Sequence, residues 1–149
     1  MRIILIINIL LRILLGSMML YGGTQKFAKP MPSPTQIIDE VRAGKSPEAD
    51  LEKLKIRNYI FGLKQSGFFW QMLGALELLV GILLLAQITS LLAATLAMPL
   101  TLNIFLFHLF LEPNDTAELL QTLALLLANV WLIGVEFPRW RPLLRSRIW

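Results

Sequence analysis

The chain has 149 residues, of which 56% are hydrophobic and only 16% are charged, whereas about a quarter of the residues of a soluble domain are charged. The formal net charge is +4, but the basic residues flank apolar segments, which is typical of a membrane surface and not of a nucleic-acid-binding module. The segment from Gly67 to Leu111 contains one acid, one histidine and no Lys or Arg. Composition therefore predicts an integral membrane protein whose partner is the lipid bilayer and which does not bind nucleic acid.

A membrane-spanning helix needs about 20 consecutive apolar residues. Four windows satisfy this length, at residues 3–22, 68–86, 91–111 and 117–137. The first window could instead be a cleaved signal peptide, but Arg12 interrupts it and no small-residue cleavage site follows. We therefore predict an all-α fold, a four-transmembrane-helix bundle, in which residues 1–149 form a single membrane domain.

The loop at residues 23–66 is the one long polar stretch, and it predicts two short amphipathic helices. Ser33-Pro34 and Ser46-Pro47 each place a capping residue before a proline at the first helical position, and Gly44 is a plausible stop between them. These helices are expected to lie on the membrane surface or over the mouth of the bundle. Apolar residues form a stripe on the second of them: Ile56, Tyr59, Ile60 and Leu63.

Charge next to the last span predicts the orientation. Four spans put both termini on the same side of the membrane. Loops and tails rich in Lys and Arg next to a span stay in the cytoplasm, so we expect cytoplasmic termini. The basic residues of the tail are Arg139, Arg141, Arg145 and Arg147.

Missing residue types restrict the chemistry. The chain has no cysteine and a single histidine, which excludes disulfides, thiol redox motifs and thiolate metal sites, and also bis-histidine haem ligation by this chain alone. We predict no metal site and no covalently bound cofactor. Any redox chemistry would need a diffusible cofactor such as a quinone, or a partner subunit.

Arg12 and Glu77 are charges inside apolar spans. Each lies nine residues from the inner end of its span, about 13 Å deep at 1.5 Å per residue, so the sequence predicts that they pair. Glu77 shares a helix face with Gly67, Gly74 and Gly81, where another helix could approach closely. The alternative to a functional site here is a buried pair that only fixes the helix register.

The other two spans also carry polar residues on one face. Span four has a stripe within about 40° at 100° per residue, made of Glu118, Thr122, Asn129 and Glu136. Span three carries Asn103, and His108 one turn from the outer end, near Glu112. We therefore predict a polar cavity inside the bundle, deepest at Arg12, Glu77 and Asn129 and opening outward at His108. The candidate ligand-binding residues are Arg12, Glu77, Asn103, His108 and Asn129.

Segments over most of the chain resemble the DoxX family of small membrane proteins. They are, in order, Arg12-Ile13-Leu14-Leu15-Gly16, Tyr21-Gly22-Gly23, Lys26-Phe27, Pro30-Met31-Pro32, Leu76-Glu77-Leu78-Leu79-Val80-Gly81, Asn103-Ile104-Phe105-Leu106-Phe107-His108 and Arg141-Pro142-Leu143-Leu144. Residues 35–65 depart from the family pattern, being longer and more charged. The resemblance implies a multi-pass protein of the bacterial inner (cytoplasmic) membrane. Because the family is named after the quinone-reactive subunit of a thiosulfate:quinone oxidoreductase, it also implies association with an oxidoreductase partner.

Three functions fit these features, and they leave open whether the chain is an enzyme. The first is a redox-associated subunit that binds a quinone or a similar lipophilic molecule, with protons relayed by Glu77 or His108. The second is a non-enzymatic membrane scaffold or assembly factor, in which the Arg12–Glu77 pair is structural. The third is a small-solute carrier, which a bundle of this size could form only as a homo-oligomer.

Overall fold

The computed structural model describes residues 2–28, 42–43, 51–87 and 89–144. The helices of this part are α1 (Arg2–Ala28), α3 (Leu51–Gln65), α4 (Phe69–Leu85), α5 (Ser90–Leu111), α6 (Thr116–Val135) and α7 (Phe137–Leu144). The predicted all-α fold is confirmed. The second predicted loop helix is α3, while its predicted start and most of the first loop helix, which was to end at Gly44, lie outside the described residues.

The long helices turn most of their apolar surface outward. α1, α5 and α6 are each long and apolar enough to cross a membrane, yet only 22–28% of their most apolar stretches is buried inside the chain. The fourth predicted span is α4, which has 17 residues and passes the same test only together with the end of α3. Ile3 and Leu120, for example, are 73% and 65% exposed. Lipid solvates such side chains, whereas water would not.

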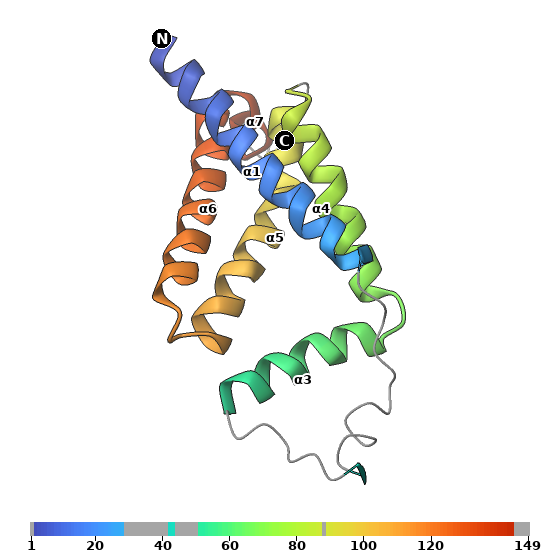
Figure 1. The fold of residues 1–149 in the computed structure, drawn as a ribbon. Helices are drawn as coiled ribbons and strands as arrows, with labels where there is room; N and C mark the ends of the chain where they lie inside the picture. Colours follow the sequence, from blue (N-terminus) through green and yellow to red (C-terminus); the bar gives the residue numbers. More distant parts are fainter. Residues whose placement is uncertain (1, 29–41, 44–50, 88, 145–149) are drawn as a thin grey trace.

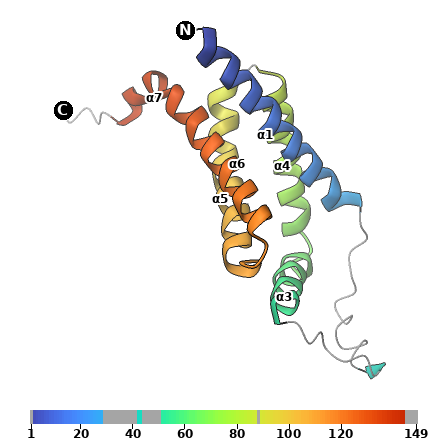
Figure 2. The same ribbon diagram turned by 60° about the vertical axis from the view of Figure 1, so that its left-hand side comes forward.

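The four long helices form two pairs. α1 packs mainly against α4, and α5 mainly against α6, and the two pairs lie side by side (Figure 1, Figure 2). We call the end where α1 begins and α6 ends the terminal end, and the end where α4 begins and α5 joins α6 the α3 end. The hydrophobic core contains Leu15, Met19, Val80, Leu84, Ala93, Ala94, Ala97, Leu100, Leu125 and Leu132.

Two pairs of glycines fix the register of α1 against α4. A Cβ built on Gly16 would lie 3.1 Å from the carbonyl oxygen of Gly81, and one built on Gly81 would lie 2.9 Å from that of Gly16. Seven residues further along α1, a Cβ on Gly23 would lie 3.0 Å from the carbonyl oxygen of Gly74. The two backbones are therefore in contact, as small residues allow between membrane helices. We call these four residues the glycine seam.

The seam separates Arg12 from Glu77, so the predicted pair is wrong. Because the helices are antiparallel, Arg12 is level with Leu85 at the end of α4, whereas Glu77 is level with Leu20. Residues 12 and 20 of α1 are about 12 Å apart along the helix axis. The prediction treated the inner ends of the two spans as level, but α1 begins at Arg2, ten residues before the position that is level with the end of α4.

Gly67 does not belong to the seam, although the sequence places it in the same series of glycines. It lies between α3 and α4 with φ +78°, in the left-handed region that favours glycine, and no described residue other than its chain neighbours lies within 4 Å of a Cβ built on it. The chain bends there by 91°. Ser66 Oγ accepts a hydrogen bond from the backbone N–H of Phe69 (2.9 Å), and α3 therefore turns across the end of the bundle (Figure 1).

A polar network joins the two helix pairs at the terminal end. Arg12 donates a hydrogen bond to Gln87 Oε1 in the α4–α5 turn (3.1 Å) and lies 3.6 Å from Glu136, just after α6. Glu136 also accepts a hydrogen bond from Ser90 at the start of α5 (3.1 Å) and pairs with Arg139 of α7 (2.8 Å). Arg12 is thus paired near the end of the bundle, where a charge costs less than at the middle of a bilayer.

Candidate functional site

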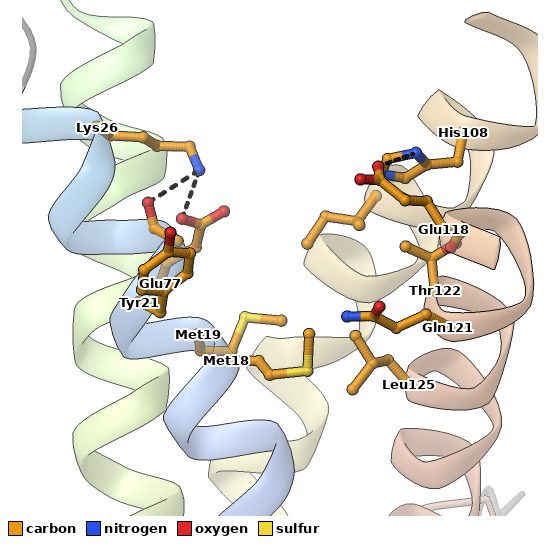
Figure 3. A pocket seen from close by; sticks show the side chains of 12 residues that line it. Met18, Met19, Tyr21, Lys26, Glu77, His108, Glu118, Gln121, Thr122 and Leu125 are labelled. Atoms are coloured by element: carbon orange, nitrogen blue, oxygen red, sulfur yellow. Dashed lines mark hydrogen bonds and ion pairs between the residues drawn. The ribbon is translucent and has the colours of Figure 1, made fainter. Parts of the chain in front are cut away.

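A cavity of about 260 Å³ lies between the two helix pairs, toward the α3 end. Its walls are α1 and α4 on one side and α5 and α6 on the other (Figure 3). The cavity therefore lies where the pairs separate, at the opposite end from the network around Arg12. It is lined by Met18, Met19, Tyr21, Gly22, Lys26, Glu77, Ile104, His108, Glu118, Gln121, Thr122 and Leu125.

The first wall carries an ion pair between Lys26 and Glu77. Lys26 Nζ lies 2.6 Å from Glu77 Oε2, and the two side chains are only 14% and 3% exposed. Gly22 leaves room for this pair, because a Cβ there would lie 3.3 Å from Glu77 Oε2. The ammonium group also lies 5.3 Å from the centre of the Trp70 ring, and the indole N–H of Trp70 donates to the carbonyl oxygen of Lys26 (3.2 Å). These contacts hold a cation in a fixed position on the wall.

The direction of the side chains explains why Lys26 reaches Glu77. Side chains on a helix lean toward its N-terminus. Lys26 therefore leans back along α1, while Glu77 leans along the antiparallel α4 in the opposite direction, so the two charged groups converge. Arg12 and Glu77 lean away from each other for the same reason.

The second wall carries His108 and Glu118, from the last turn of α5 and the first turn of α6. His108 Nδ1 lies 2.6 Å from Glu112 Oε2, which confirms the predicted neighbour, and 3.4 Å from Glu118 Oε2. Asp115 and Thr116 are the residues at the start of this helix that the sequence offers as its cap. Asp115 takes this role, since its carboxylate accepts a hydrogen bond from the backbone N–H of Glu118 (3.0 Å). The hydroxyl of Thr122 donates to the carbonyl oxygen of Glu118 (2.9 Å), which leaves its oxygen as an acceptor.

Apolar side chains close the cavity between the two walls. Met18, Met19 and Leu125 lie across its floor (Figure 3), and the methionine side chains can adapt to the shape of a ligand. The volume lies just below the range of about 300–1,000 Å³ that is usual for pockets of drug-sized ligands. The cavity is thus large enough for one small ring that carries hydrogen-bonding groups at opposite edges. Any apolar tail of such a ligand would have to extend out of the cavity.

The structure brings only two of the five candidate residues to the cavity. Glu77 and His108 line it, one on each wall. Arg12 lies in the network at the terminal end. Asn103 is exposed and accepts a hydrogen bond from the Tyr59 hydroxyl of α3 (3.4 Å). The cavity is therefore not deepest at Arg12 and Asn129, as the sequence predicted, but lies between the ion pair and His108.

Asn129 connects α6 to the backbone of α5 and is fully buried. With its amide oriented so that donors face acceptors, Nδ2 donates to the carbonyl oxygen of Ala94 (3.0 Å), and Oδ1 accepts from the backbone N–H of Met98 (3.0 Å) and lies 3.2 Å from Thr101 Oγ1. This contact is next to Pro99, through which α5 continues. Asn129 therefore holds two helices together, as polar residues often do in membrane proteins.

Sequence reasoning missed Lys26 and Gln121 as parts of the cavity. The predicted first span ends at residue 22, and Lys26 reaches the cavity because α1 continues past it to Ala28. A signal was present in the sequence: Gly16 and Gly23 have the same spacing as Gly74 and Gly81. Gln121 gives no such signal, because it lies outside the polar stripe of its helix.

The family model of DoxX matches residues 7–109, more than half of the chain. No curated protein and no solved structure matches the sequence. The matched residues include the Lys26–Glu77 wall and His108, whereas Glu118 and Thr122 of the second wall lie beyond them.

Proposed function

Because the chain belongs to the DoxX family of multi-pass membrane proteins, we propose that it is a redox-associated membrane subunit that binds a quinone, or a similar lipophilic carbonyl compound, in the cavity between its helix pairs. One observation carries the proposal. The cavity combines an apolar floor with polar side chains on opposite walls, and a quinone has two carbonyl oxygens at opposite edges of an apolar ring.

Each wall can serve one carbonyl oxygen. An ammonium group has three N–H donors, and Lys26 directs two of them to Glu77 (2.6 Å) and to the carbonyl oxygen of Gly22 (3.5 Å). The third N–H remains for a ligand. On the opposite wall, His108 and Gln121 offer ring and amide N–H donors. The apolar tail of a quinone would leave the cavity toward lipid, because the volume holds little more than the ring.

Protons and electrons would take different routes in this proposal. Reducing a quinone to a quinol consumes two electrons and two protons. Glu77 and His108 are groups of the cavity that can exchange protons. The chain has no cysteine, so we assign the supply of electrons to a partner oxidoreductase.

The experiment that tests the proposal is purification of the chain from its native membranes in mild detergent, with mass spectrometry of the lipophilic molecules that remain bound. We expect a quinone to co-purify with the natural chain and to be lost from Gln121→Leu and His108→Gln. Asn103→Leu is the matched control, because Asn103 lies outside the cavity, and it should retain the quinone. A chain that carries only phospholipid, or that keeps its quinone in both cavity variants, would contradict the proposal.

A scaffold function has separate support. Arg12 bonds to the α4–α5 turn and Asn129 to α5, and Trp131 of α6 donates to Asn8 of α1 (3.0 Å). Much of the polar content of the spans thus holds the bundle together. If only partner proteins and phospholipid co-purify, the scaffold proposal replaces the redox one, and the identity of the partners then defines the function.

We also propose that the terminal end faces the cytoplasm of a bacterial inner membrane. Arg139 and Arg141 lie there on α7, next to the end of α6, and basic residues beside a span are retained on the cytoplasmic side. A cysteine introduced at Arg139 should then react with a membrane-impermeant reagent only after the cells are opened. Labelling of this cysteine in intact cells would contradict the proposal and show that the terminal end faces away from the cytoplasm.

A further inference from the structure

The α3 end holds a cluster of potential metal ligands, of which the proposed function uses only His108. His108, Glu112 and Glu118 each direct one donor atom toward the others, and these three atoms lie within 4.8 Å of one another. Figure 3 shows His108 and Glu118 side by side at the edge of the cavity. In contrast to the prediction of no metal site from the sequence, we propose that these three side chains bind a divalent transition-metal ion, with Zn²⁺ as the best fit.

The spacing of the donor atoms suits such an ion. Zn²⁺ binds imidazole nitrogen and carboxylate oxygen at about 2.0–2.2 Å, so neighbouring ligands of a tetrahedral ion are about 3.4 Å apart. His108 Nδ1 lies 2.6 Å from Glu112 Oε2 and 3.4 Å from Glu118 Oε2. A small rotation of the side chain of Glu112 would bring the shorter distance to the same value.

Two buried atoms of the cluster lack a hydrogen bond. Among the described residues, neither His108 Nδ1 nor Glu112 Oε2 has a hydrogen-bonding partner of suitable geometry, although the two atoms are only 2.6 Å apart. Buried polar atoms are nearly always satisfied by protein, water or an ion. A metal ion between them would accept a lone pair from each atom, and it would balance the two carboxylates that meet one imidazole.

The backbone holds the three ligands in place. His108 and Glu112 are four residues apart, and the backbone N–H of Glu112 donates to the carbonyl oxygen of His108 (3.2 Å). Asp115 links Glu112 to Glu118. Its backbone N–H donates to the carbonyl oxygen of Glu112 (3.2 Å), and its carboxylate accepts a hydrogen bond from the backbone N–H of Glu118 (3.0 Å). The side chains of His108 and Glu112 are only 14% and 24% exposed and lose little freedom when a metal binds, whereas that of Glu118 is 56% exposed and is ordered by the ion.

The nature of the ligands selects the metal. One imidazole and two carboxylates, without thiolate, suit zinc, manganese or ferrous iron and not copper(I). Three protein ligands leave at least one coordination position open. His108 and Glu118 also line the cavity, so we place the open position toward it.

Titration of the purified chain tests the proposal. After treatment with a chelator, the chain in detergent is titrated with Zn²⁺ in a calorimeter, and Co²⁺ is then used as a spectroscopic probe of coordination. We expect one ion per chain, and an affinity that falls at least about ten-fold in Glu112→Gln and in Glu118→Gln. His108→Ala should lose the d–d bands of nitrogen-coordinated Co²⁺.

Asp115→Asn is the matched control. It removes a carboxylate from the same loop but keeps the cap, because asparagine caps helices as well as aspartate does, and it should bind Zn²⁺ like the natural chain. The proposal is overturned if the natural chain shows no saturable binding of one ion, or if the Glu112 and Glu118 variants bind as tightly as Asp115→Asn. Glutamine substitutions preserve size, and circular dichroism verifies that each variant remains folded.

Discussion

Gly81→Ala should lower the free energy of unfolding of the bundle by about 1–3 kcal/mol, the usual cost of overpacking a close contact. The added Cβ would lie 2.7 Å from Leu20 Cγ and 2.9 Å from the carbonyl oxygen of Gly16. The side chain of Leu20 can rotate away, but the backbone of Gly16 can move only if α1 separates from α4. Unfolding by a denaturing detergent, followed by circular dichroism, measures the loss.

Gly134→Ala provides the matched control for this substitution. Gly134 lies in α6, and in the part of the chain that the structure describes no neighbouring helix or loop comes within 4 Å of a Cβ built there. The change should be neutral or slightly stabilising, because alanine favours a helix more than glycine does. Equal stability of the Gly81 and Gly134 variants would mean that the glycine seam does not form.

Glu77→Gln should lower the free energy of unfolding by about 3 kcal/mol, within the range for removing one partner of a buried ion pair. The change leaves the charge of Lys26 without its partner in a site where the lysine side chain is only 14% exposed. The same unfolding assay measures this loss. A Glu77→Gln variant as stable as the natural chain would show that the ammonium group of Lys26 reaches water or lipid head groups instead.

The double variant Lys26→Met, Glu77→Gln separates a structural role of the pair from a functional one. Removing both charges should restore most of the lost stability, because an isolated buried charge is the costly species. If the pair only stabilises the fold, the double variant should also retain bound ligand. The proposed function predicts a stable double variant that has lost its quinone, because the ammonium donor is gone.

The apolar spans and the α6 cap could be predicted because both depend on local sequence. Hydrocarbon length determines how many apolar residues a span needs, and capping depends on residues within one turn, as at Asp115. The inward face of span four could also be read from periodicity, and Thr122 and Asn129 are buried. Local rules were sufficient for each of these features.

The register of the helices depends on contacts between distant residues, and the pairing of Arg12 and Glu77 failed for that reason. Equal depth was inferred from the inner ends of the two spans, whereas α1 begins ten residues before the position that is level with the end of α4. Matching Gly16 and Gly23 with Gly74 and Gly81 would have given the register. The structural role of Asn129 could not be predicted, because periodicity shows which face of a helix is polar but not which residues that face contacts.

The central claim of this account is that the cavity between the helix pairs binds a quinone. The chain contains no cysteine, so a single introduced thiol reports on one position without background. Thr122 lines the cavity, and cysteine is close to threonine in volume although it lacks the methyl group. Leu127 on the same helix is 58% exposed on the apolar surface, and Leu127→Cys provides a lipid-facing control.

The most direct measurement is the rate at which a small charged thiol reagent modifies Thr122→Cys in lipid nanodiscs, with and without a short-chain quinone. We predict that Thr122→Cys reacts faster than Leu127→Cys, because the cavity is polar and admits water, and that saturating quinone slows this reaction. If Thr122→Cys is as unreactive as Leu127→Cys, or if quinone leaves its rate unchanged, the cavity is not the binding site.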